Sequence, residues 1–256
     1  TQKSGKIKAG SYELKPNTTP RGLIDLMVRG EFAQESLTII EGWTFRQMRE
    51  AVANNKGLRH DTAKLSDTEL MAKISPDYKA PEGLFFPDTY LFAKGASDLT
   101  IYKQAHTVLL TKLKAAWEQR AEGLPYTTPY QALVMASIVE KETGKESERP
   151  MIAAVFVNRL KRGMMLQTDP TVIYGIGQKF DGNIRKKDLE TDTPYNTYMR
   201  SGLPPTPIAL PGEKSLAAAL GPATTEALYF VSRGDGSSQF SDNLPDHNRA
   251  VNKFQR

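Results

Sequence analysis

A chain of 256 residues can form one large domain or two small ones, and its 39% hydrophobic content is enough for a substantial core. The chain contains no cysteine, which excludes a disulfide framework, a thiol nucleophile and thiolate metal sites. Its net charge of +5 is modest and its basic residues are scattered, so the composition does not favour a nucleic-acid-binding protein. No apolar run approaches the length of a membrane span, and no signal peptide is present. Since the chain opens at Thr1 without an initiator Met, we expect it to be a piece of a longer protein.

Residues 1–75 are predicted to form small alternating strands and helices. The expected elements are strands over 12–14 and 37–40 and helices that begin at Pro20, after Thr44 and after Ser66. The first helix is expected to end at Gly30. Ser66 and Glu69 have the spacing of a capping box, which supports the third helix.

Residues 76–97 are rich in proline and aromatic side chains and lack a regular period, which predicts loops or short strands that connect two lobes. Asp98 is expected to cap a long amphipathic helix that ends near Gly123. This helix is interpreted as scaffold, and its His106 is given no catalytic role.

The next predicted helix contains a long apolar segment that is followed directly by a carboxylate, Glu140. Thr128 is expected to cap this helix and Pro129 suits its first turn. The apolar residues behind the carboxylate are Ala132, Leu133, Val134, Met135, Ala136, Ile138 and Val139. Contact with them and with the negative end of the helix dipole should raise the pKa of Glu140, as a proton donor near neutral pH requires. The alternative is a solvated glutamate in the last turn of an ordinary helix.

The remaining elements are predicted from apolar periodicity and turn residues. They are a helix over 147–162, a helix over 213–220, a hairpin of strands 227–232 and 239–241 around Gly234, and a helix from Pro245 onward.

Several motifs occur in order from about Glu82 to the C-terminus. They are E-G-L-F-F-P-D-T-Y from Glu82, S-I-V-E-K-E-T from Ser137, F-x-N-R-L from Phe156, L-Q-T-D-P-T-V-I-Y-G from Leu166, Y-N-T-Y from Tyr195 and G-L-P-P from Gly202. Together they resemble the catalytic region of the endolytic murein transglycosylases, the YceG-like (MltG) family. The resemblance covers roughly two-thirds of the chain.

The resemblance implies an α+β protein of two domains: a small LysM-like subdomain over residues 1–75, expected to be incomplete at its N-terminus, and a larger helix-rich catalytic domain with a β-hairpin over 76–256. A small α/β adaptor without carbohydrate affinity is the alternative for the first part. The family also implies a bacterial inner-membrane protein with one N-terminal transmembrane helix, absent from this chain, and an extracytoplasmic, periplasmic body. Its implied partners are peptidoglycan glycan strands and the peptidoglycan synthases of elongation or division.

The activity implied is that of a lyase that cleaves the β-1,4 bond between N-acetylmuramic acid and N-acetylglucosamine inside nascent glycan strands, ending strands as part of cell-wall biogenesis and degradation. Hydrolytic glycosidases usually need two carboxylates. In a lytic transglycosylase the C6 hydroxyl of the N-acetylmuramic acid attacks instead, which leaves a 1,6-anhydro end, so one carboxyl group can donate and then recover the proton. Glu140 is the candidate for both steps. Glu142, two positions further, should project to another side of the helix and is interpreted as a poor second acid.

Gln167 is expected to bind an N-acetyl group of the substrate or the Glu140 carboxyl. Asp169 precedes Pro170 and is either a site residue or a helix cap. Arg159 is expected to be an ion-pair partner of the site or a substrate ligand. Ser137, one turn before Glu140, is expected to hydrogen-bond to it or simply to pack between helices.

Four further polar or aromatic side chains complete the predicted site. Tyr195, Asn196 and Tyr198 are expected to provide rings that stack on sugars and amide donors, and Tyr174 is expected to pack beneath them.

No metal or cofactor is predicted. The three histidines lack paired spacing, and the chain has neither a P-loop nor a Rossmann glycine pattern. The nearest alternative function is a hydrolytic muramidase that uses Glu140 with Asp169. A second alternative, from another class, is a non-catalytic cell-wall-binding or divisome scaffold.

Overall fold

The computed structural model describes residues 7–8, 12, 14, 16–30 and 34–255. These residues form a mostly helical α+β structure with two small antiparallel sheets. The elements in chain order are α1 (Pro20–Arg29), β1 (Gln34–Thr38), α2 (Phe45–Asn54), α3 (Asp67–Ile74), β2 (Thr89–Ala93), α4 (Asp98–Glu118), α5 (Pro129–Glu142), η2 (Glu146–Glu148), α6 (Arg149–Lys161), α7 (Asp169–Ile176), η3 (Gly177–Lys179), α8 (Lys186–Glu190), α9 (Glu213–Leu220), β3 (Tyr229–Ser232), β4 (Ser238–Ser241) and α10 (Leu244–Phe254).

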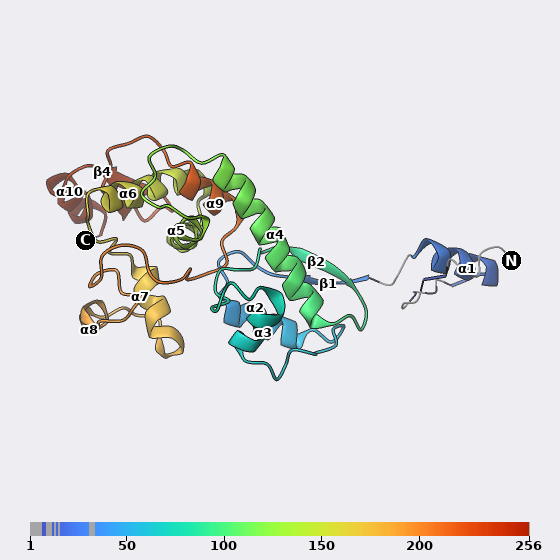
Figure 1. The fold of residues 1–256 in the computed structure, drawn as a ribbon. Coiled ribbons are helices and arrows are strands. Elements are labelled where there is room, and N and C mark those ends of the chain that lie inside the picture. The colour runs from blue at the N-terminus through green and yellow to red at the C-terminus, as the bar shows by residue number, and fades with distance from the viewer. Residues whose placement is uncertain (1–6, 9–11, 13, 15, 31–33, 256) are drawn as a thin grey trace.

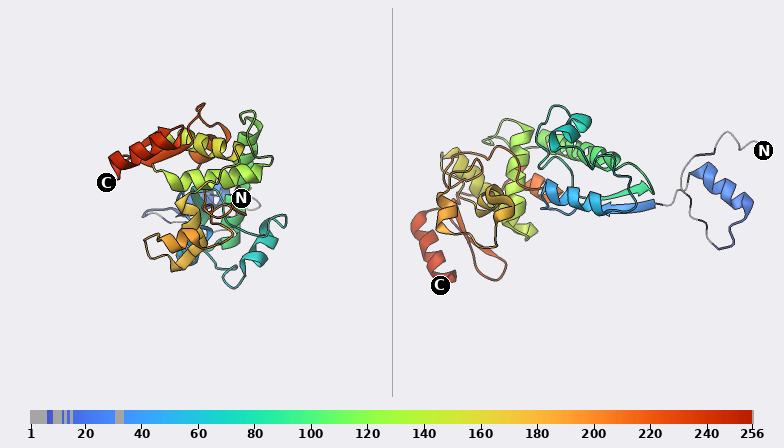
Figure 2. Two further views of the ribbon diagram at one scale, coloured as in Figure 1. Left: turned by 90° about the vertical axis from the view of Figure 1, so that its left-hand side faces the viewer. Right: turned by 90° about the horizontal axis from the view of Figure 1, so that it is seen from below.

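Helix α1 lies at one end of the molecule, apart from the other elements (Figures 1 and 2). The Thr19 hydroxyl accepts the Gly22 N–H at its start, and Gly30 ends it in the left-handed conformation at φ 72°. No residue of α1 is buried. The helix is therefore held by its caps rather than by a core.

The two sheets connect different parts of the chain. Strand β1 pairs with β2 from Gln34↔Ala93 to Thr38↔Thr89, so the predicted connection after residue 76 returns a strand to the first part of the chain. Strands β3 and β4 form the predicted hairpin around Gly234. Its turn is tight because the Asp235 carboxylate accepts hydrogen bonds from the N–H and hydroxyl of Ser237.

Helix α5 is the centre of the larger lobe. All eight of its residues from Ala132 to Val139 are buried, and it packs against α4, α6 and α9. Helix α4 runs from this group to α3 and β2, and so joins the two lobes (Figure 1). A helix buried on every side can end only where the protein provides partners for its last polar groups.

One continuous core includes residues of both lobes. Phe45 at the start of α2 stacks on Phe85 at a centroid distance of 5.2 Å, and Tyr102 of α4 lies 6.1 Å from Phe45. The same cluster of buried side chains includes Leu133 and Met135 of α5. The boundary predicted at residue 75 and the LysM-like character of the first part remain predictions.

Most of the predicted helices are confirmed. Thr44 and Ser66 form capping boxes at α2 and α3, and Thr128 caps α5. Asp98 is not the cap of α4: Ser97 holds that position, and the buried Asp98 carboxylate instead accepts the N–H and hydroxyl of Thr62. Helix α8 was not predicted from the sequence. The predicted strand over 12–14 lies partly outside the described residues, and neither Tyr12 nor Leu14 is in a strand.

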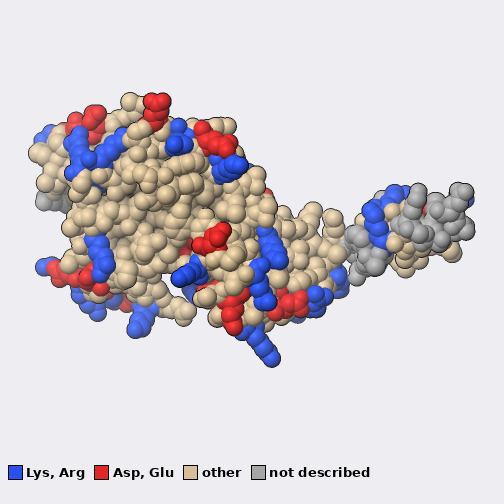
Figure 3. Space-filling model, viewed as in Figure 1, with Lys and Arg blue, Asp and Glu red and all other residues tan. Residues whose placement is uncertain are grey.

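Over the described residues, no helix has both the length and the apolar character to cross a bilayer. Lysine and arginine side chains are mixed with acidic ones on the face shown in Figure 3, in keeping with the scattered charges of the sequence.

The shared core predicts that the two lobes unfold together. Phe45→Ala should lower the free energy of unfolding by about 3–5 kcal/mol, because it removes a ring that packs on both Phe85 and Tyr102. A denaturant titration followed by circular dichroism measures this. Ile24→Ala, at an exposed position of α1, is the control and should change the value by less than about 0.5 kcal/mol. Two separate transitions, of which only one moves in Phe45→Ala, would contradict a shared core.

Candidate active site

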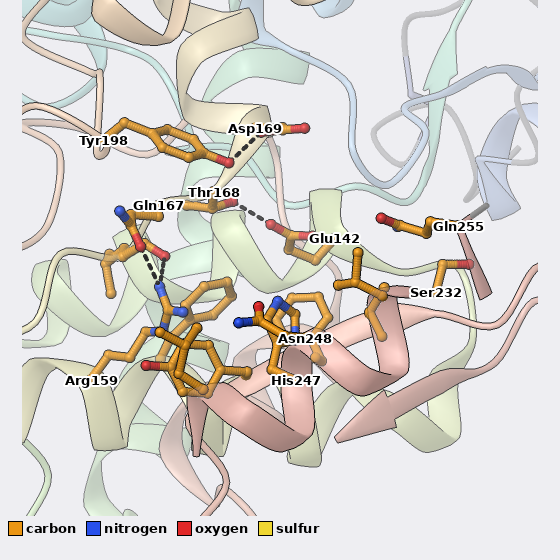
Figure 4. Close-up of a pocket in the computed structure, with 17 residues that line it drawn as sticks. Glu142, Arg159, Gln167, Thr168, Asp169, Tyr198, Ser232, His247, Asn248 and Gln255 are labelled. Atoms are coloured by element: carbon orange, nitrogen blue, oxygen red, sulfur yellow. Dashed lines mark hydrogen bonds between the residues drawn. The ribbon is translucent and has the colours of Figure 1, made fainter. Parts of the chain in front are cut away.

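A pocket of about 630 Å³ opens between the C-terminal end of α5, the loop before α7, β3 and α10 (Figure 4). This volume is in the range of sites that hold small ligands or one to a few sugar units. Its lining residues are Glu142, Phe156, Arg159, Leu166, Gln167, Thr168, Asp169, Tyr198, Tyr229, Phe230, Val231, Ser232, Leu244, His247, Asn248, Val251 and Gln255.

Glu142, the last residue of α5, directs its carboxyl group into this pocket (Figure 4). The Thr168 hydroxyl donates a hydrogen bond to Glu142 Oε1. Loss of hydration raises the pKa of Glu142 to about 7, and the negative charge of Asp169 adds to this, against the opposing effect of the Thr168 hydrogen bond. The carboxyl group can therefore be protonated or ionised near neutral pH.

Glu140 has a different environment. Arg149 Nη2 lies 3.1 Å from Glu140 Oε1, and the side chains of this ion pair are only 9% and 5% exposed. Glu140 Oε2 accepts hydrogen bonds from the Gly212 N–H at 2.9 Å and the Ser215 hydroxyl at 2.7 Å. These donors lie at the N-terminal end of α9, where a negative charge is favourable. Glu140 does not line the pocket, and its ion pair and hydrogen bonds tie α5 to α6 and α9.

Helix geometry separates the two carboxylates. Successive residues are rotated by about 100° around the axis of an α-helix. The two steps from Glu140 to Glu142 therefore turn the side chain by about 200°, to nearly the opposite side of the helix. Glu142 lies on a different side of α5 from Glu140, as its spacing predicts, and this side of the helix faces the pocket. The raised pKa belongs to Glu142, which has no cationic partner, whereas Glu140 is paired with Arg149.

Gln167 and Arg159 lie together at the edge of the pocket. The non-glycine residue Gln167 has φ 52°, a conformation that L-residues rarely adopt. Its N–H donates to the Thr197 carbonyl, and Arg159 Nη1 donates to its Oε1 at 3.3 Å and to the Leu166 carbonyl at 2.9 Å. Arg159 is thus a buried support for the Gln167 loop rather than an ion-pair partner, and no contact between Gln167 and Glu140 is present.

Asp169 and Tyr198 are brought together across the pocket wall. The Tyr198 hydroxyl donates to Asp169 Oδ1 at 2.6 Å (Figure 4). Thr168 is the N-cap residue of α7 and Asp169 is the first helical residue, so capping is not the role of this carboxylate. Both residues line the pocket with Glu142.

Tyr174 and Tyr195 lie elsewhere. Their rings meet edge-on at 4.7 Å, and they line a second pocket of about 320 Å³ at the start of α2. The Tyr174 hydroxyl donates to Glu82, which also accepts the N–H of Phe45 at 2.9 Å. Burial raises the pKa of Glu82 to about 7. Tyr174 and Tyr195 do not join Glu142, and Tyr174 packs against Tyr195 but not beneath Tyr198.

Asn196 and Ser137 are fully buried and have structural partners. The Asn196 amide donates to the carbonyls of Asp188, Leu189 and Thr191, and its Oδ1 accepts the N–H of Tyr198. The Ser137 hydroxyl donates to the Val134 carbonyl and accepts the Ile208 N–H. Neither side chain can reach a ligand in the pocket, and the expected bond from Ser137 to Glu140 is absent.

Thr168 and the residues of β3 and α10 line the pocket but were not predicted as site residues from the sequence. Thr168 lies inside the L-Q-T-D-P motif, so its position was signalled there, whereas the C-terminal helix has no motif that marks it as part of the site. Among the described residues, no group of three or more histidine or acidic side chains could hold a metal ion.

A carboxyl group with a pKa near 7 in the wall of a sugar-sized pocket is the arrangement of an acid–base enzyme. The profile of the YceG-like family matches residues 1–253. The chain belongs to the YceG-like family. This confirms the family and the class of enzyme predicted from the motifs.

Two relatives and a solved structure show the extent of the similarity. The "Endolytic murein transglycosylase" of Bacillus subtilis (strain 168) is 33% identical over 270 residues, 97% of this chain and 73% of that protein. The protein of the same name from Streptococcus pneumoniae serotype 2 (strain D39 / NCTC 7466) is 28% identical over 96% of this chain, which spans 50% of that protein. A crystal structure at 2.6 Å of a yceG-like protein from Listeria monocytogenes matches with a TM-score of 0.69 at 32% identity, over 95% of this chain and 84% of that one.

The raised pKa of Glu142 predicts a pH-dependent stability difference. Because the pKa is raised from 4.5 to about 7 on folding, the wild type loses stability as the pH rises from about 4.5 to about 7. Glu142→Gln cannot ionise, so its melting temperature relative to the wild type should be higher at pH 8 than at pH 5. Glu82 titrates in both proteins and cancels in the comparison. An equal difference at both pH values would show that the Glu142 pKa is ordinary.

Proposed function

We propose that this protein is an endolytic lytic transglycosylase of peptidoglycan that cleaves the β-1,4 bond between N-acetylmuramic acid and N-acetylglucosamine, with Glu142 as its acid and base. The observation that carries the proposal is the Glu142 carboxyl group, which has a pKa of about 7 and faces a pocket of sugar size. The names of the relatives support the same substrate. Glu140, the residue favoured by the sequence, is less well suited because it is ion-paired outside the pocket.

The reaction needs one group that alternates between two protonation states. Protonated Glu142 gives its proton to the glycosidic oxygen, and the bond from C1 of the N-acetylmuramic acid to that oxygen breaks. The C6 hydroxyl of the same sugar then forms a bond to C1, and its proton returns to Glu142. The carboxyl group is restored and no water is consumed. A tethered hydroxyl has a high effective molarity, which replaces the activation of a water molecule.

Other pocket residues have supporting roles in this proposal. Thr168 fixes the orientation of the Glu142 carboxyl through its hydrogen bond. The Asp169 carboxylate lies in the same pocket, where its negative charge would stabilise the positive charge that develops on the sugar ring. Gln167, held in a strained conformation by Arg159, offers its side-chain amide to the substrate.

A hydrolytic muramidase is the second candidate, because Asp169 and Glu142 line one pocket and two carboxylates are what hydrolysis usually requires. A wall-binding scaffold without turnover is less well supported, since it gives no reason for a proton-exchanging carboxyl group in the pocket wall.

We further propose, from the resemblance of the motifs, that the whole protein is held in the bacterial inner membrane by a single N-terminal helix with this body on the periplasmic side. Nascent glycan strands would be its substrate, and peptidoglycan synthases of elongation or division would work beside it. Whether residues 1–75 add affinity for glycan is part of the same proposal.

Paired substitutions distinguish the two carboxylates. Glu142→Gln keeps the shape of the side chain but cannot cycle a proton, so turnover of purified glycan strands should fall by roughly 10²–10⁴-fold. Glu140→Gln weakens the bond to Arg149 and should lower stability, while the folded fraction keeps most of its activity. Rates are compared per folded protein, after circular dichroism at the assay temperature. The reverse order of effects would return the catalytic role to Glu140.

Product chemistry decides between transglycosylase and muramidase. If the C6 hydroxyl attacks, digestion of sacculi in ¹⁸O-labelled water should yield muropeptides that end in 1,6-anhydro-N-acetylmuramic acid and carry no label. Mass spectrometry reads both properties at once. Labelled reducing ends would instead establish hydrolysis, with Asp169 as the candidate second carboxylate.

A further inference from the structure

One face of the C-terminal helix forms the side of the pocket that the proposed mechanism does not use. The residues of α10 that line the pocket are Leu244, His247, Asn248 and Val251, with Gln255 just beyond its end. Their spacing of three and four residues places them on one stripe of the helix. Figure 4 shows Asn248 and His247 across the pocket from Asp169 and Tyr198, with Glu142 between the two sides.

Asn248 has a free amide on this stripe. Its side chain is exposed and makes no hydrogen bond to any other residue in the described part of the chain. An amide has both a donor and an acceptor to offer a ligand. The neighbours of Asn248 on the same stripe, Leu244 and Val251, are apolar, and Leu244 is 51% exposed.

His247 is held in place by an aromatic contact. Its ring stacks on Tyr229 of β3 at a centroid distance of 5.1 Å and an interplanar angle of 23°. Nδ1 is buried without a hydrogen-bond partner, and Nε2 is not buried in this way, so Nε2 is the nitrogen that a ligand in the pocket can reach. Burial, with the nearby positive charge of Arg159, lowers the pKa of His247, so the ring is neutral and has one N–H to donate.

We propose that Asn248 and His247 bind the acetamido group of an N-acetylhexosamine unit and so determine which sugar lies beside Glu142. The inference rests on the proposed function and adds a specificity site to it. Asn248 donates to the acetamido carbonyl and accepts from its N–H, His247 supplies a second donor, and the acetyl methyl group contacts Leu244 or Val251.

The chemistry of the stripe favours a neutral amide over a charged ligand. Asn248 and His247 are both uncharged, and the Asp169 carboxylate in the same pocket would repel an anion, while the guanidinium of Arg159 is already bonded to the carbonyls of Met165, Leu166 and Leu228. A hydroxyl group in place of the acetamido group would use part of the hydrogen-bonding capacity and leave Leu244 and Val251 without an apolar partner. The stripe thus suits a group that is polar at one end and methylated at the other.

Isothermal titration calorimetry of the whole chain with two neutral tetrasaccharides tests this. Chitotetraose carries acetamido groups at C2, and cellotetraose carries hydroxyl groups at the same positions. The wild type should bind chitotetraose more tightly, and Asn248→Ala should weaken that binding by roughly tenfold while weakening the binding of cellotetraose clearly less. Asn252→Ala is the matched control, since Asn252 is exposed on the same helix outside the pocket, and it should bind both sugars like the wild type.

A second variant tests His247 separately. His247→Phe keeps a ring to stack on Tyr229 but removes both nitrogens, so it should weaken chitotetraose binding several-fold and cellotetraose binding less. Equal binding of the two sugars by the wild type, no binding of chitotetraose, or an equal loss for both sugars in Asn248→Ala would overturn the inference. Binding does not require turnover: a protein that shows the acetamido preference but releases no anhydro product would refute the proposed reaction and leave this inference standing.

Discussion

The burial of α5 on every side is the constraint on which the rest of the structure depends. Because α4, α6 and α9 surround this helix, its last turn must place two carboxylates inside protein. Glu140 is compensated by Arg149 and by the N-terminal end of α9, and these contacts tie three helices together. The Glu142 carboxyl group has only the Thr168 hydroxyl as a partner and otherwise faces the pocket. It therefore loses hydration without a compensating charge. One helix end thus carries two carboxyl groups in different environments, of which Glu142 faces the pocket and Glu140 faces an ion-pair partner.

The same arrangement explains why the pocket is built from distant parts of the chain. The 630 Å³ space is lined by α6, by the loop that enters α7, and by β3 with α10. These elements all follow α5 in the sequence, so contacts within α5 alone do not position them. Gln167, at φ 52°, has an unfavourable conformation that costs about 1–3 kcal/mol. The buried guanidinium of Arg159 holds the loop by donating to the Leu166 and Met165 carbonyls, and the Thr197 hydroxyl accepts the Thr168 N–H. The strain in this loop is therefore offset by hydrogen bonds to Arg159 and Thr197.

The sequence was sufficient for the helices because their signals are local. Capping residues and apolar periods predicted α2, α3, α5 and α9 within a few residues, whereas the pairing of β1 with β2 depends on contacts across more than fifty residues and has no local signature. The motifs led to the segment of the chain that borders the pocket, and within that segment Glu142 rather than Glu140 lies in the pocket wall. Apolar neighbours along the helix suggested that Glu140 is desolvated, and the partner that compensates it, Arg149, could be identified only in three dimensions.

A second carboxyl group with a pKa of about 7, Glu82, lies outside the active pocket and shows that a raised pKa does not by itself mark a catalytic acid. Glu82 is enclosed by partners: the N–H of Phe45 and the hydroxyl of Tyr174 occupy its two oxygens, and it links α2 to α7. Glu142 has one oxygen bonded to Thr168 and borders open space that a ligand can fill. The two carboxyl groups therefore differ in whether lost hydration is combined with an unfilled hydrogen-bonding position facing a pocket. That combination is found at Glu142, opposite the polar stripe of α10.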